Sequence, residues 1–233
     1  MRRAIIVVAV LLGSPVWGLT YMGAPSSDVK QGELFFGFDY SNSELDFEFR
    51  GATSKGILDD VDSDLYMGRA GIGVLDGLEL FGRFGVGEVE DLGNEFSWGF
   101  GTRATFGKKD DVRWGVLFQV TSLCVDEDGA IGDYQLAGDF DVYEYQLAIG
   151  PTFGDDDETQ VYLGPFFHFV DGDADLVTHG PVDVEQESEV GLYIGVSWEV
   201  AGNTRLNIEF QGTDDAKFGG IGLVHRLGGS DEP

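Results

Sequence analysis

Hydrophobic and polar residues alternate with a period of two along much of this chain. From Phe96 to Phe106, apolar residues such as Trp98 occupy almost every second position, with small or polar residues such as Arg103 between them. The next segment, 112–123, repeats the pattern with Val, Trp and Phe. Successive side chains of a β-strand point to opposite faces of a sheet, so this pattern predicts strands with one apolar and one polar face.

Ten segments have the pattern or the apolar content expected of strands. Their lengths are close to the roughly ten residues that a tilted strand needs to cross a lipid bilayer. A soluble sheet rarely places large apolar residues along one whole face in strand after strand, whereas the lipid-facing side of a membrane barrel requires them. The predicted strands are 32–41, 65–75, 78–87, 96–107, 112–123, 141–154, 160–170, 188–200, 204–212 and 217–227.

The connections between these strands alternate in length, which is typical of membrane barrels with short periplasmic turns and longer outer loops. The short connections are 76–77, 108–111, 155–158 and 202–203, and the long ones are 42–64, 88–95, 124–140 and 171–187, with 213–216 as a short exception. The chain is therefore predicted to be all-β, as a transmembrane antiparallel up-and-down β-barrel. Ten strands fit best, with eight or twelve as alternatives.

On these strands and turns, the chain resembles the small, porin-like outer-membrane β-barrel proteins of Gram-negative bacteria over residues 31–227. The resemblance implies an integral protein of the bacterial outer membrane, surrounded by lipids and lipopolysaccharide and inserted by the barrel assembly machinery. A closed barrel has no exposed sheet edge, so it can stand as a monomer, although the sequence does not fix the oligomeric state. Such barrels often end on an aromatic residue, whereas here the last strand ends at Leu227 and residues 228–233 follow as a tail.

The first residues have the organisation of a secretory signal. Arg2 and Arg3 precede an apolar stretch at 4–12, and small or turn-forming residues follow to Gly18. We therefore expect a signal peptide over 1–18, with an approximate cleavage site, and a periplasmic segment over 19–30 before the barrel.

The chain is strongly acidic, with a formal net charge of −28. This charge argues against nucleic acid as a partner, because phosphate backbones require a cationic surface. The acidic residues cluster in the predicted connections, where solvated loops are the simplest interpretation. The single cysteine, Cys124, excludes an internal disulfide.

The period of two assigns a set of charged residues to the inside of the barrel. An arginine facing lipid near the midplane would cost about 2–4 kcal/mol, whereas inside the barrel it can pair with glutamates. The predicted lumen network consists of Arg69, Arg83, Arg103, Arg113 and Arg205 with Glu79, Glu144, Glu189, Glu199 and Glu209. Either these side chains fill a narrow barrel, or they line a selective pore, for which many lumen glycines would leave space.

Other candidate chemistry is weaker. His168 or His179 beside a loop aspartate could imitate the outer-rim Asp and His residues of the omptin proteases. Asp171, Asp173 and Asp175 have the spacing of a calcium loop, but the glycine and glutamate that an EF-hand requires further on are missing, so they are only weak metal candidates. No cofactor motif is evident.

The sequence thus predicts a non-enzymatic outer-membrane barrel, acting as a narrow pore for small ions or solutes or as a structural and surface-binding element. A barrel-rim hydrolase and a soluble periplasmic lipid-binding barrel are the alternatives.

Overall fold

The computed structural model describes residues 19–50, 55–89, 93–125, 130–131, 134–154, 159–177, 180–185, 190–214 and 216–227. These residues form twelve strands, and among them there is no helix long and apolar enough to cross a membrane. The strands are β1 (Leu34–Arg50), β2 (Lys55–Leu75), β3 (Leu78–Val89), β4 (Gly93–Lys109), β5 (Val112–Val125), β6 (Ala130–Ile131), β7 (Tyr134–Phe153), β8 (Gln160–Leu176), β9 (Gly180–Glu185), β10 (Val190–Ala201), β11 (Thr204–Gly212) and β12 (Ala216–Leu227).

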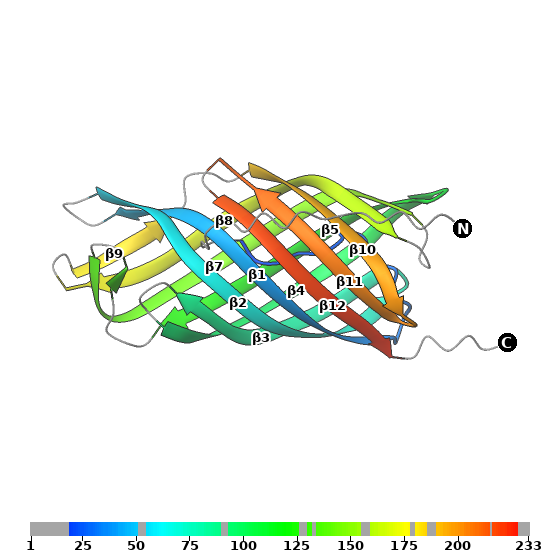
Figure 1. Ribbon diagram of the computed structural model, residues 1–233, viewed down its shortest axis with the longest axis horizontal. Helices are drawn as coiled ribbons and strands as arrows, with labels where there is room; N and C mark the ends of the chain where they lie inside the picture. Colours follow the sequence, from blue (N-terminus) through cyan, green and yellow to red (C-terminus); the bar gives the residue numbers. More distant parts are fainter. Residues whose placement is uncertain are drawn as a thin grey trace.

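Ten of these strands close into one antiparallel barrel. Each pairs with the next along the chain, in the order β1, β2, β3, β4, β5, β7, β8, β10, β11 and β12. The barrel closes between the first and last strands, where Leu34 pairs with Leu227 and Leu45 with Ala216. The tilted strands form a single tube in Figure 1. The predicted all-β, ten-stranded, up-and-down barrel is confirmed.

The predicted strand ends are accurate at one end of the barrel and short at the other. At the end with the short turns, β2 and β3 meet at Asp76–Gly77, where Gly77 has φ 77° and provides the left-handed backbone of the turn. At the other end, β1 and β2 continue to Arg50 and Lys55, so most of the predicted loop 42–64 is paired strand. The extension of β1 keeps the period of two over 44–49, with Leu45, Phe47 and Phe49 between acidic residues, so the predicted end at residue 41 stops short of a pattern that continues.

The small strand β9 extends the sheet beyond the long-loop end. It pairs with the end of β8, from Asp171 to Leu176, and with β1 from Glu48 to Arg50. It lies beside these ends at one extremity of Figure 1. The sequence predicts a connection over 171–187. In the structure, its described residues belong largely to the end of β8 and to β9.

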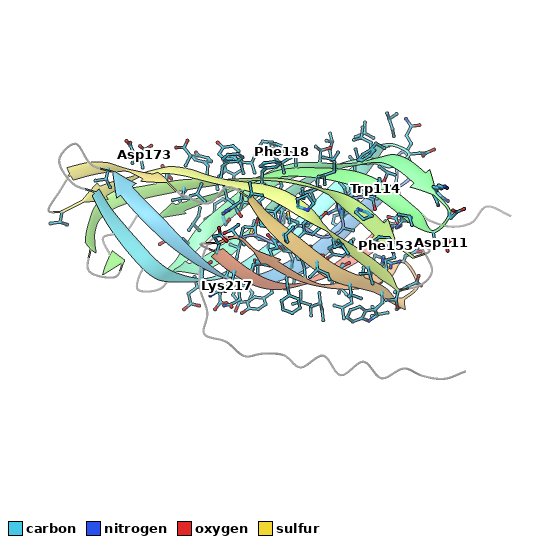
Figure 2. All side chains as sticks on the ribbon, turned by 90° about the horizontal axis from the view of Figure 1, so that it is seen from above. Asp111, Trp114, Phe118, Phe153, Asp173 and Lys217 are labelled. Carbon is cyan, nitrogen blue, oxygen red and sulfur yellow. The ribbon has the colours of Figure 1, made fainter. Side chains whose placement is uncertain are left out.

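The outer face of the barrel is apolar. Trp114 and Phe118 project outward between Asp111 at the short-turn end and Asp173 towards the other end (Figure 2). A continuous exposed surface of this size is foreign to soluble monomers and matches the hydrocarbon of a bilayer. Its members include Phe36, Phe38, Phe84, Phe96, Trp98, Phe100, Trp114, Phe118, Ile149, Phe167, Leu192, Ile194, Phe210, Ile221 and Leu223.

Residues 19–29, which precede β1, lie inside the barrel. Leu19, Tyr21 and Met22 are at most 2% exposed. At the short-turn end, the backbone N–H of Gly77 donates to the carbonyl of Val29 at 2.9 Å. This corrects the expectation that residues 19–30 form a separate periplasmic segment; we name them the N-terminal segment. Residues 1–18 and 228–233, the predicted signal peptide and tail, lie outside the described residues.

A charge on the outer face should destabilise the barrel strongly. Phe84 is 61% exposed near the middle of β3, and we expect Phe84→Arg to lower the free energy of unfolding by about 2–4 kcal/mol. The control is Asp111→Arg, in an exposed turn outside the apolar band. Denaturant unfolding of the refolded protein in phospholipid vesicles measures both, and equal losses would contradict a lipid-facing Phe84.

Candidate functional site in the barrel lumen

The N-terminal segment is bound to the barrel wall by polar side chains near the short-turn end. Ser27 and Thr105 exchange two hydrogen bonds: Ser27 N–H donates to Thr105 Oγ1 at 3.0 Å, and Thr105 Oγ1 donates to the Ser27 carbonyl at 2.6 Å. The Ser26 hydroxyl donates to Thr152 Oγ1 at 2.7 Å. Asp28 forms an ion pair with Arg226 of β12. These contacts fix the segment to three separate strands.

Further into the lumen, side chains of the barrel wall form hydrogen bonds with backbone groups of the segment. Both carboxylate oxygens of Glu209 accept hydrogen bonds, from Met22 N–H at 3.0 Å and Gly23 N–H at 2.9 Å. Thr20 N–H donates to Glu144 Oε1 at 3.0 Å, and its carbonyl accepts from Gln211 Nε2 at 2.9 Å. Buried backbone groups need such partners, so the polar wall and the segment satisfy one another.

Glycines in the wall provide the room for the segment. A Cβ at Gly73 would collide with the carbonyl of Lys30, and a Cβ at Gly115 would collide with Pro25 and Ser26. The sequence suggests that these glycines leave an open lumen, but the N-terminal segment occupies the space.

Aromatic rings occupy the space at other glycines. A Cβ at Gly191 would collide with Phe166, and one at Gly195 with Tyr162. Both rings pack against Tyr193, with centroids 6.3 Å apart in each pair. The lumen is therefore closed by the segment and by buried rings together.

Two clusters of ion-paired side chains lie on the inner wall, and each contains arginine and a carboxylate. Asp39 of β1 forms an ion pair with Arg83, and its Oδ2 is 4.0 Å from Arg69 Nε. In the second cluster, Arg103 Nη1 donates to Glu79 Oε1 at 2.8 Å, and its Nη2 donates to the Met22 carbonyl at 2.8 Å. Arg103 thus connects the wall network to the N-terminal segment.

Most of the charged residues assigned to the lumen by sequence lie on the inner face. Glu199 differs: it is exposed at the end of β10, beside a β-bulge that interrupts the alternation of faces. Glu189 lies outside the described residues. Arg69, Arg83, Arg113, Arg205, Glu79, Glu144 and Glu209 are buried, and Arg103 is half-buried and faces the same space.

Two acidic residues of the lumen are absent from the network that the sequence predicts. Asp39 follows the period of two, since Phe36 and Phe38 face outward and Asp39 must face inward, so the pattern could have identified it. Asp28 precedes the first strand, and no sequence pattern indicates that it would enter the lumen.

The residues considered for catalysis and metal binding do not form an open site. His168 is fully buried, with its Nε2 3.0 Å from Glu144 Oε1, and His179 lies outside the described residues. Asp171 and Asp173 are exposed on β8, and Asp175 is in the same strand. Among the side chains that the structure describes, no group of three His, Cys, Asp or Glu could hold a metal ion.

Several solved structures are similar to this chain in fold. The outer membrane protease OmpT from Escherichia coli is 7% identical, with a TM-score of 0.49, over 83% of this chain and 94% of its own. An outer membrane channel from Pseudomonas putida F1 is 10% identical, with a TM-score of 0.47, over 90% and 100%. The attachment invasion locus protein Ail of Yersinia pestis is 13% identical, with a TM-score of 0.37, over 85% and 100%. No family model and no curated protein matches the chain.

At these identities the likenesses concern the fold alone. The closed antiparallel barrel, its apolar outer face and its polar lumen define an integral β-barrel of the outer-membrane class. The apolar residues lie outside, opposite to the arrangement that a soluble lipid-binding barrel requires.

Removing the carboxylate of Asp39 should destabilise the barrel more than removing an exposed one. In Asp39→Asn, Arg83 and Arg69 lose their shared acidic partner, and breaking a buried ion pair costs about 3–5 kcal/mol. The matched control is Glu88→Gln on the exposed part of β3, expected within about 0.5 kcal/mol of wild type. Denaturant unfolding in vesicles measures both. A second change, Arg83→Gln, should recover part of the loss; absence of any recovery would argue against the pair.

Proposed function

We propose that the protein is a non-enzymatic outer-membrane barrel whose narrow pore is closed at rest by its own N-terminal segment. The observation that carries this proposal is the position of residues 19–30, which occupy the lumen without joining the barrel as a strand. Outer-membrane lipids and lipopolysaccharide are its expected surroundings, and small ions or solutes its expected cargo.

The contacts of the segment support a removable closure. They are largely hydrogen bonds such as Ser26 to Thr152 and Met22 to Glu209, with one ion pair from Asp28. A neutral hydrogen bond such as Ser26 to Thr152 contributes only about 0.5–1.5 kcal/mol net, and one to a carboxylate such as Glu209 about 1.5–3 kcal/mol, because water can replace either partner. The segment also buries Leu19, Tyr21 and Met22, and Val29 packs against Phe35 and Phe81 of the wall, so its departure must also offset the exposure of these side chains.

The wall that the segment covers also suits a pore. Without the segment, the glycines at Gly73 and Gly115 would leave space beside Arg103, Glu79 and Glu209. Rings of charged side chains at a constriction determine ion selectivity in other channels. A barrel meant to be permanently solid could be filled by larger wall side chains, and this wall instead has glycine where the segment passes.

The position of His168 supports a non-enzymatic role. It is fully buried beside Glu144, and Phe166 lies 6.4 Å from its ring. A rim hydrolase needs its acid–base pair within reach of a substrate, and a polypeptide substrate cannot reach this position while the lumen is closed.

The proposal also covers the first residues of the chain. Leu19 is only 1% exposed in the lumen, so removal of residues 1–18 as a signal peptide would leave the new N-terminus inside the barrel. Determining the first residue of the mature protein by mass spectrometry would check this boundary.

Removing the segment should open the barrel to ions. We expect the refolded chain to be silent in a planar bilayer, and a variant lacking residues 19–30 to show discrete conductance steps. In the opposite direction, Ser26→Cys with Thr152→Cys, in a Cys124→Ser background, should form a disulfide between segment and wall and remain silent.

Insertion is verified independently for each variant by protease protection in vesicles. Silence of the inserted deletion variant would contradict the pore and leave a structural or surface-binding barrel closed by its own side chains. Failure of the two cysteines to cross-link would contradict the position of the segment.

A further inference from the structure

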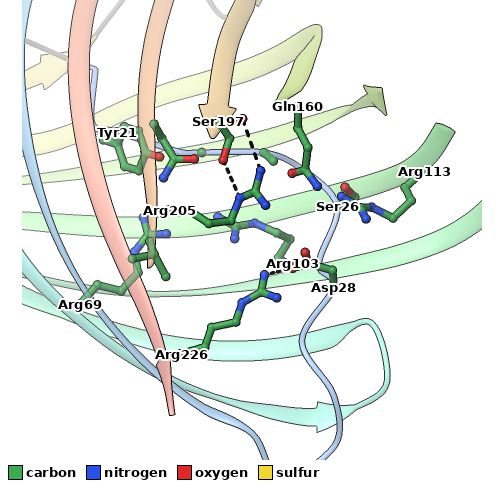
Figure 3. Close-up of a pocket in the computed structure, with 14 residues that line it drawn as sticks. Tyr21, Ser26, Asp28, Arg69, Arg103, Arg113, Gln160, Ser197, Arg205 and Arg226 are labelled. Atoms are coloured by element: carbon green, nitrogen blue, oxygen red, sulfur yellow. Dashed lines mark hydrogen bonds and ion pairs between the residues drawn. The ribbon is translucent and has the colours of Figure 1, made fainter. Parts of the chain in front are cut away.

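The short-turn half of the lumen contains a cavity lined largely by arginine. Its arginines come from five different strands, and those labelled in Figure 3 extend into one space beside the N-terminal segment. Among the lining residues, Asp28 is the one acidic side chain. The cavity is small, with room for a few waters or one small ion. The arginines are Arg69, Arg103, Arg113, Arg205 and Arg226.

Positive charge exceeds negative charge around this cavity. Arg83 lies behind the lining and brings the guanidinium groups to six, against the four carboxylates of Asp28, Asp39, Glu79 and Glu209 among the described side chains of this half. Glu144 is further away, at the far end of the N-terminal segment. Among these ten charged groups, positive charge therefore exceeds negative charge by two.

Groups at the mouth change this balance little. Glu33 accepts from the backbone N–H of Lys30 at 2.9 Å, and Asp76 accepts from the backbone N–H of Gln31 at 2.9 Å. These contacts are exposed, so water and salt screen the charges of Lys30, Glu33 and Asp76. Glu199 is exposed, and water and salt screen its charge.

Arg69 has donors available for a ligand. It is 3% exposed, and its Nε and Nη2 have no hydrogen-bond partner among the described residues. Its guanidinium lies 4.5 Å from the ring centre of Phe81 and 5.5 Å from that of Tyr21, which hold it in place without using its N–H groups. Buried donors without a partner are rare in folded proteins, and an anion in the cavity would supply an acceptor.

We propose that this cavity binds a small, doubly charged oxyanion, for which inorganic phosphate is the representative ligand. Guanidinium groups donate paired hydrogen bonds to phosphate oxygens, and a dianion balances the two excess charges. The limited volume and the position inside the barrel favour a free ion over the head group of a lipid. The site needs the N-terminal segment in place, because Tyr21, Ser26 and Asp28 form part of its lining, so its test uses the closed barrel and does not require a pore that opens.

Calorimetric titration tests the site on the chain from Leu19 onward, refolded in lipid-free detergent micelles. Phosphate is added at constant ionic strength, and we expect saturable one-site binding that sulfate displaces and singly charged nitrate does not. Arg113→Gln and, separately, Arg205→Gln should each raise the Kd for phosphate at least tenfold.

The matched control removes positive charge from the same end of the barrel but outside the cavity. Lys108→Gln with Lys109→Gln changes two exposed residues of a short turn, and the Kd should stay within twofold of wild type. Equal weakening in the control and in Arg113→Gln would overturn the site, as would the absence of saturable binding to wild type. Binding that occurs only after phosphatidylglycerol vesicles are added would also overturn it, in favour of a lipid head group. The wild-type competition experiment decides the matter even where an arginine variant does not refold.

Discussion

The structure depends on the need of buried polar groups for partners in a barrel that lipid surrounds. The strands meet this need for their own backbone by closing between β1 and β12. The inner wall must meet it for side chains, because arginines cannot face the lipid. Asp39 and Glu79 satisfy part of this requirement, and the N-terminal segment satisfies another part by contributing Asp28 and several backbone groups.

The barrel can be predicted from sequence because one simple physical contrast determines it. Outside residues such as Trp114 meet hydrocarbon, and inside residues such as Arg113 meet polar groups, so the period of two is visible along each strand. The same contrast explains where prediction fails. The backbone pairing of β1 and β2 continues to Arg50 and Lys55, but the polar run Ser41-Asn42-Ser43 interrupts the apolar face of β1 and suggests a loop in the sequence.

The interior can be predicted only in part. The period of two assigns a face to each residue, so it identifies the inward arginines and could have identified Asp39. The period of two does not say which inward side chains form ion pairs, because pairing depends on strand tilt and register. It also does not detect a β-bulge such as the one beside Glu199. The position of the N-terminal segment escapes prediction for a different reason: its contacts are with residues about 50 to 200 positions away, as between Ser27 and Glu79 or Asp28 and Arg226, and no local pattern encodes them. The wall glycines are the available signal, but sequence alone does not distinguish a glycine beside empty space from one beside another segment of the chain.

The closure of the lumen and the anion cavity are physically coupled through Asp28. This carboxylate belongs to the N-terminal segment, pairs with Arg226 and lines the cavity. A dianion placed among the same arginines repels Asp28 and offers Arg226 another acceptor, so it weakens one contact that holds the segment. It also gains from the segment, because Tyr21 and Ser26 contribute to the lining of the cavity. Linkage requires the two effects to be reciprocal: if the ion favours the closed barrel, closure must raise affinity for the ion by the same factor. The sign of the coupling between ion binding and closure therefore depends on which effect is stronger, the repulsion between the ion and Asp28 or the contacts of the ion with the segment. The low dielectric of the lumen strengthens this repulsion.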